Sequence, residues 1–272
     1  MPARHPLSLA VALVAAALAV PALAVPAAAT PAAAGPAPTG AVAYAVDLGS
    51  VPGARVSVDR GARQGDGSCR FTAGGTGRPA GGRVRYVTEL SFDPATCERR
   101  LATADYARGA VPAAVRARLA TDRQTAGAAG RRASAAAAPR TAAAGSWSGA
   151  LQVNVEDPVQ INVTSTRSTL DWSYDGTTLS ADHGAGWGWF ALSGWERRDH
   201  RWTPTNTGTV ASTDTYGKFR NGVFCFGITT WTEHKLTYFE GRPDGTWTWS
   251  ADVVKSGGCN GLLHYEYLVE TP

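Results

Sequence analysis

The chain has 272 residues, of which 44% are hydrophobic and 18% charged, and its formal net charge is +4. This small charge hides two halves of opposite sign: seventeen basic against eight acidic residues precede Ser146, and nine against fourteen follow from there on. The arginines of the first half are scattered and carry no interleaved aromatic residues, so the pattern excludes a nucleic-acid-binding stripe and we expect no nucleic-acid partner.

The amino terminus has the pattern of a secretory signal peptide. Arg4 and His5 precede an apolar run from Leu9 to Val20, and small residues follow up to Ala24. The run is too short to span a bilayer and no second one follows, so we expect a signal peptide over residues 1–24 and no transmembrane segment in the mature chain. The usage of Ala, Arg and Gly is similar to that of proteins exported by high-GC bacteria, and the sequence predicts a secreted, extracellular protein.

Two Ala-rich stretches divide the rest of the chain. Residues 25–40 are almost entirely Ala, Pro, Thr and Gly, which predicts a disordered spacer, and residues 124–145 predict an Ala/Arg-rich linker. A surface helix is the alternative for the linker, although it lacks an apolar stripe. The pair Arg131 and Arg132 is the place where a protease would cut most easily. The expected bodies are a small module at 41–123, which is permanent or a pro-region, and a second domain at 146–272.

Four cysteines predict two disulfide bonds, since an even number of cysteines in an exported chain pairs most simply. Sequence order favours Cys69 with Cys97 and Cys225 with Cys259. Each bond is worth roughly 3–4 kcal/mol by the chain-entropy model. No pair has the short Cys-x-x-Cys spacing of a zinc site, and we expect neither a metal nor a cofactor.

The module at 41–123 has the pattern of a small α+β fold. Residues 54–58 and 83–92 alternate apolar and polar side chains, and residues 68–72 form a short strand around Cys69. Val111, Val115 and Leu119 recur at every fourth residue, which predicts a short amphipathic helix.

The segment 146–272 predicts an all-β domain of many short antiparallel strands, a sandwich or a barrel. Apolar alternation marks strands over 151–155, 159–163, 170–174, 224–228, 247–253 and 263–269. Turn signals stand at 175–176, 221–222, 244–245 and 260–261.

All nine tryptophans lie in this second segment. Trp172, Trp247 and Trp249 share strand faces with other apolar residues, so we expect them in the core. A second group lies among glycines in a stretch with little strand pattern, where exposed rings would form platforms for sugar rings. These candidate ligand-binding residues are Trp187, Trp189, Trp195 and Trp202.

No catalytic motif is present, so acid–base candidates rest on residue type alone. A glycosidase needs two carboxylates at a suitable separation, such as Asp171 and Glu266 across a cleft. His264 and Glu266 share a strand face as a hydrogen-bonded or merely solvated pair, and Asp182 with His183 lies in the glycine-rich stretch.

We therefore expect a secreted, non-catalytic module that binds carbohydrate or cell-envelope polymer. The first alternative is a secreted hydrolase, with a glycosidase ahead of a peptidase. The second is a protein-interaction or inhibitor module that presents Trp231, Tyr238 and Phe239 between Cys225 and Cys259.

Overall fold

The computed structural model describes residues 40–46, 48–78, 81–117 and 145–272. The predicted signal peptide at 1–24, the spacer up to residue 39 and the linker from 124 to 144 lie outside the described residues. Within the described ranges, no helix has the length and apolar character needed to cross a membrane.

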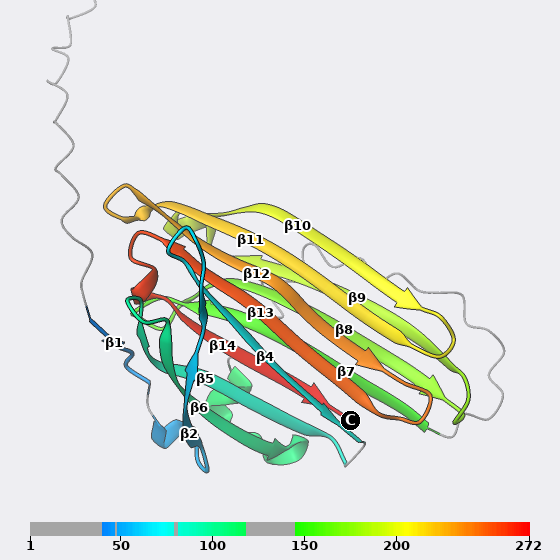
Figure 1. The fold of residues 1–272 in the computed structure, drawn as a ribbon. Coiled ribbons are helices and arrows are strands. Elements are labelled where there is room, and N and C mark those ends of the chain that lie inside the picture. The colour runs from blue at the N-terminus through cyan, green and yellow to red at the C-terminus, as the bar shows by residue number, and fades with distance from the viewer. Residues whose placement is uncertain (1–39, 47, 79–80, 118–144) are drawn as a thin grey trace, which may run out of the picture. The chain divides into compact units, whose positions relative to one another are not determined.

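The fold is an antiparallel β-sandwich of two sheets, which confirms the mainly β prediction and selects the sandwich over the barrel (Figure 1). The eight-stranded sheet has the spatial order β2 (Arg55–Arg60), β6 (Glu98–Ala107), β5 (Arg83–Asp93), β14 (His264–Thr271), β7 (Gly145–Glu156), β8 (Asn162–Tyr174) and β9 (Leu179–Trp189), with β1 (Val42–Ala43) paired to β5. The six-stranded sheet has the order β10 (Trp195–Asn206), β11 (Ala211–Cys225), β12 (Ile228–Gly241), β13 (Trp247–Gly257), β4 (Cys69–Gly77) and β3 (Ala62–Arg63).

Strands from the two ends of the chain pair within the same sheets. β5 pairs with β14 from Thr88 opposite Glu266 onward, and β4 pairs with β13 from Cys69 opposite Lys255 onward. The sequence predicted two bodies joined by a linker, whereas this pairing makes residues 41–117 and 145–272 parts of one sandwich. Composition indicates only the break in the chain, because β4 and β5 lie more than 150 residues upstream of the strands β13 and β14 with which they pair.

Alternating side chains from both sheets fill the core between them. Trp172 and Trp249 are fully buried as expected, and Trp247 is half-buried against the same core. Both predicted disulfides are present, Cys69–Cys97 and Cys225–Cys259. Of the predicted helix, the described residues 113–117 are helical. Val111 just before them and Val115 within them pack on the outer face of the eight-stranded sheet. Leu119 lies outside the described residues.

Two predicted strands are loops instead. The alternation at 159–163 falls mostly in the β7–β8 connection, where Asp157 accepts hydrogen bonds from the backbone N–H groups of Val159 and Ile161. The alternation at 224–228 spans the β11–β12 turn, and Phe226 has a positive φ of 49° there. The turns predicted at 175–176, 244–245 and 260–261 lie between strands, whereas Asn221 and Gly222 lie inside β11 at a register shift.

The core contains a seam of buried hydroxyl groups between β8 and the six-stranded sheet. Thr164 and Thr166 of β8 lie within hydrogen-bond distance of Thr232 and Thr237 respectively. His234 is fully buried in this seam, with its Nδ1 atom 2.8 Å from the Thr166 hydroxyl oxygen. Burial lowers the pKa of His234 from 6.5 to about 3, because the charged imidazolium is poorly solvated there.

This buried histidine predicts acid sensitivity of the fold. Because the folded pKa lies below the unfolded one, the unfolded state binds a proton that the folded state does not, and stability falls as pH drops from 6.5 toward 3. Two pH units in this window correspond to about 3 kcal/mol. Chemical denaturation at a series of pH values gives the free energy of unfolding as a function of pH. In His234→Gln the slope of this plot should fall by the equivalent of about one proton. The exposed control His200→Gln should keep the wild-type slope, and an unchanged slope in His234→Gln would contradict the assignment.

Candidate ligand-binding site

The four tryptophans expected on flexible loops lie instead on strands β9 and β10. Trp187 and Trp195 are buried, at 6% and 2% exposure, and Trp189 and Trp202 are half-buried. Trp187 donates a hydrogen bond from its Nε1 atom to the carbonyl oxygen of Tyr216, 2.7 Å away. Trp187 and Trp195 therefore belong to the core, whereas Trp189 and Trp202 pack against it and keep part of their surface exposed.

The glycines that indicated a loop occupy the other face of β9. A Cβ atom at Gly184 would lie 2.3 Å from the hydroxyl oxygen of Thr169 on β8, so a larger residue would require the Thr169 side chain to shift. Strand alternation at period two therefore persists through this stretch, with small residues on one face and large ones on the other. The small residues concealed the pattern.

Asp171 and Asp182 are brought together on the outer face of the eight-stranded sheet. They are direct cross-strand partners on β8 and β9, and both are exposed. They line a pocket of about 360 Å³ together with the side chains of Arg108, Arg167, Thr169 and Glu270. His183 is 8% exposed and burial lowers its pKa.

The proposed pairing of Asp171 with Glu266 across a cleft is not formed. Asp171 lies opposite Ser148 of β7, whereas Glu266 lies opposite Asn154 of the same strand. Six residues along a strand correspond to about 20 Å, which is too far for two carboxylates to act on one glycosidic bond.

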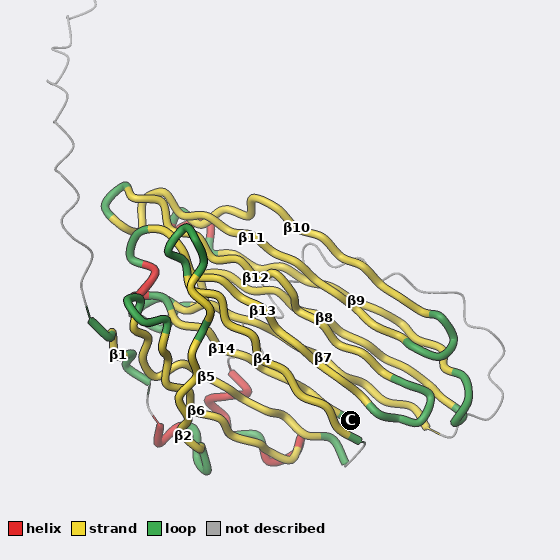
Figure 2. Tube along the Cα trace, viewed as in Figure 1, coloured by secondary structure: helices red, strands yellow, loops and turns green. Residues whose placement is uncertain are grey.

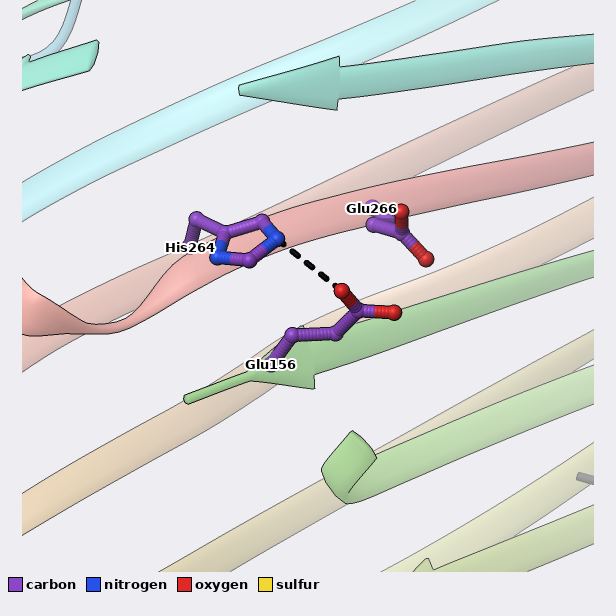
Figure 3. Close-up of side chains that lie close together, drawn as sticks. All are labelled: Glu156, His264 and Glu266. Atoms are coloured by element: carbon purple, nitrogen blue, oxygen red, sulfur yellow. Dashed lines mark hydrogen bonds and ion pairs between the residues drawn. The ribbon is translucent and has the colours of Figure 1, made fainter. Parts of the chain in front are cut away.

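His264 and Glu266 share a strand face as expected, but the histidine bonds to a different acid. The Nε2 atom of His264 lies 3.1 Å from Oε2 of Glu156, and all three side chains are buried (Figure 3). The hydroxyl of Tyr86 donates a hydrogen bond to Glu266. One ligand atom from each of Glu156, His264 and Glu266 lies within 4.8 Å of the others, so this set is the one among the described residues with the donors and spacing of a metal site. Each of the three also makes further interactions, which fits a buried polar cluster equally well.

A second pocket, of about 390 Å³, lies on the outer face of the six-stranded sheet, and we call it the Trp231 groove. Trp231 is half-buried in its wall, with the ammonium nitrogen of Lys218 at 5.0 Å from the ring centroid. The other lining residues are Gln64, Asp66, Ser68, Glu233, Lys235, Val254, Ser256 and Gly257.

The acidic groups of the Trp231 groove are held in place by hydrogen bonds. Tyr216 donates its hydroxyl hydrogen to Glu233 at 2.9 Å, and Lys218 lies 3.9 Å from the same carboxylate. Ser68 donates to Asp66 from both its backbone N–H and its hydroxyl group. These hydrogen bonds lower the pKa of Asp66, so it remains an acceptor at neutral pH.

Part of the groove was visible in the sequence. Trp231, Glu233 and Lys235 alternate with the buried Thr230, Thr232 and His234, so the tryptophan shares a face with two charges. An aromatic ring on the polar face of a strand is a signal of a binding surface. The contribution of residues 64–68 was not predictable, because it depends on the pairing of β4 with β13.

The fold and its two outer-face pockets define a two-sheet antiparallel sandwich with polar surface sites. Comparisons of the chain with protein families, curated proteins and solved structures found no match.

Proposed function

We propose that the protein is an extracellular, non-catalytic module that binds carbohydrate or cell-envelope polymer in the Trp231 groove. The observation that carries this proposal is a half-buried tryptophan beside fixed hydrogen-bonding groups in an open pocket. An aromatic ring offers a large rigid surface to the apolar face of a sugar at small entropic cost. A few polar groups placed around such a surface supply specificity.

The charges of the groove favour a neutral ligand. Lys218 and Lys235 are balanced by Asp66 and Glu233, so the pocket has no large field of one sign. Carboxylates accept hydrogen bonds from hydroxyl groups, and amides both accept and donate them, without requiring charge on the ligand. The expected ligand is therefore a neutral, hydroxyl-rich polymer.

Trp231→Ala is expected to weaken binding to a soluble polysaccharide by about 30-fold, because a central aromatic contact is worth about 2 kcal/mol. Affinity electrophoresis against a panel of soluble polysaccharides would identify the ligand, and isothermal titration calorimetry would give the affinity. Trp231→Phe should retain part of the binding, since a ring remains.

Phe226→Ala serves as the control, since it removes an aromatic ring that is fully exposed and does not line the groove. It should bind like the wild type. Equal affinity of the Trp231→Ala variant and the wild type would contradict the proposed site.

A hydrolase is the second candidate, favoured by one observation. Asp171 and Asp182 lie opposite each other in the 360 Å³ pocket, and opposite residues place their Cβ atoms roughly 5 Å apart. This spacing is compatible with the carboxylate separation of a retaining glycosidase. Release of sugar that depends on both residues would favour this function over simple binding.

A further inference from the structure

Large apolar side chains are exposed together at one end of the sandwich, a region we call the apolar tip. Among the described residues, seven of the ten exposed large hydrophobic side chains belong to it: Val159, Ile161, Phe190, Leu192, Val223, Phe226 and Ile228. Phe226 is fully exposed and Leu192 is 92% exposed. A patch of this kind on a folded protein marks an interaction surface.

Three connections build the apolar tip, and they contact one another. The β7–β8, β9–β10 and β11–β12 connections lie at the end of the sandwich away from the C-terminus (Figures 1 and 2). The backbone N–H of Phe190 donates to the carbonyl oxygen of Val163 at the start of β8. Asn221 donates from its side-chain amide to the carbonyl oxygen of Ser193. The three connections therefore lie next to one another.

The apolar tip is held rigidly. Cys225 at the end of β11 is bonded to Cys259 in the β13–β14 connection, which ties the β11–β12 turn to the neighbouring hairpin. Asn221 also accepts hydrogen bonds from the backbone N–H groups of Val223 and Phe224.

Phe226 lies in the turn between β11 and β12 and has a positive φ, a conformation that a bulky residue rarely adopts. An exposed aromatic residue in a strained conformation gives the isolated fold no stability and points to a partner outside it.

Two of the three connections of the apolar tip carry no charged side chain, and the third, β7–β8, carries Asp157, whose carboxylate accepts hydrogen bonds from the backbone of Val159 and Ile161. Residues 184–195 and 221–232, which contain two of the three connections, include no charged side chain. Glu196, Arg197 and Arg198 follow the first of these segments on β10, and Arg220 on β11 and Glu233 on β12 flank the second. Arg197 lies over the ring of Trp189 at 4.8 Å, and Arg220 pairs with Glu196.

This order of side chains fits a lipid surface. At the β9–β10 connection the apolar apex is uncharged, a half-buried tryptophan lies behind it, and arginines follow. This is the order of environments that side chains meet on leaving the hydrocarbon of a bilayer. The apolar residues lie at the ends of three separate connections, which suits shallow insertion between lipids. We propose that the apolar tip inserts into the outer layer of a lipid membrane, independently of the Trp231 groove.

Vesicle flotation tests this proposal with the chain from residue 25 onward. The probes are vesicles of pure phosphatidylcholine and vesicles with 30% phosphatidylglycerol. The wild type should float with both, since apolar insertion requires no anionic lipid. Leu192→Ser combined with Phe226→Ser should lower the partition coefficient at least tenfold, because two large apolar side chains are removed.

Val58→Ser is the matched control, since Val58 is an exposed apolar residue on β2 outside the apolar tip. It should float like the wild type, and both variants should keep the wild-type melting temperature because the replaced side chains are exposed. Failure of the wild type to bind either vesicle would overturn the proposal. Binding that requires phosphatidylglycerol and is unchanged in the double variant would also overturn it. A third contradicting result is that the protein binds no vesicles but forms a concentration-dependent dimer, which the double variant abolishes.

Discussion

Residues 146–272 expressed alone are expected not to fold. In the sandwich, β13 pairs with β4 and β14 pairs with β5, so truncation leaves both strands without partners on one side. It also removes Phe71 and Phe92 from the shared core, where each aromatic side chain is worth about 3–5 kcal/mol. Their loss together reaches the 5–15 kcal/mol of stability typical of a whole domain. Near-UV circular dichroism and thermal denaturation should show neither fixed tertiary structure nor a cooperative transition.

The truncated protein should be compared with the intact protein cleaved between residues 118 and 144, because cleavage breaks the chain at the same place but removes no strand. Neither disulfide crosses this segment, so the two fragments would be held by strand pairing and core contacts alone. They should elute together under native conditions and separate in denaturant. A cooperative transition of residues 146–272 alone would contradict the single sandwich and restore the two-body organisation predicted from composition.

Glu89→Gln is expected to destabilise the protein by about 3–5 kcal/mol, because it leaves two buried cations without their shared counter-charge. Glu89 is completely buried and accepts hydrogen bonds from Arg99 at 3.0 Å, from Lys255 and from the backbone N–H of Tyr265. Burial alone would raise the pKa of Glu89, but the charges of Lys255 and Arg99 outweigh it and lower the pKa. Chemical denaturation at pH 7 measures the loss.

Glu98→Gln provides the control for this charge deletion. Glu98 pairs with Arg60 at 2.8 Å, but their side chains are 40% and 71% exposed. Exposed pairs contribute about 0–1 kcal/mol, so this variant should unfold close to the wild type. Equal effects of the two substitutions would show that Glu89 is not the centre of a buried ionic cluster.

Local patterns in the sequence were sufficient for much of the fold. The cysteine order predicted both disulfides, and alternation predicted β5, β7, β13 and β14. The pairing of strands across the chain was not accessible, because register between distant segments depends on tertiary packing. The hydroxyl seam around His234 was also missed, since Thr164 and Thr166 have the polarity of a solvated face although they point into the core.

The two failures of strand prediction share a physical cause. At 159–163 and 224–228 the apolar residues alternate as in a half-buried strand, but Val159, Ile161, Phe226 and Ile228 are exposed at turns of the apolar tip. Only Val163 is buried and Phe224 half-buried, both within strands. Alternation predicts burial only when the apolar side chains are needed for the core. Positions where the sequence pattern predicts the wrong secondary structure are expected at functional or strained sites. The exposed residues of these turns are therefore consistent with the proposed membrane contact.

Prediction of the candidate site was limited in a similar way. Composition points to the tryptophans, but the glycine-rich surroundings of Trp187 and its neighbours predict loops where the structure has strands β9 and β10. The outward position of Trp231 follows from its alternation with the buried Thr230 and Thr232. Asp66 and Ser68 enter the Trp231 groove only through the pairing of β4 with β13.

Retention on insoluble polysaccharides and peptidoglycan tests the proposed binding function most directly. The chain from residue 25 onward, its Trp231→Ala variant and the Val58→Ser control would be incubated with each polymer, and the bound protein and released sugar measured. We predict that the wild type and the control are retained on at least one polymer without release of sugar, and that Trp231→Ala is not. Retention of no protein on any polymer would contradict the account, as would sugar release that Asp171→Asn or Asp182→Asn abolishes.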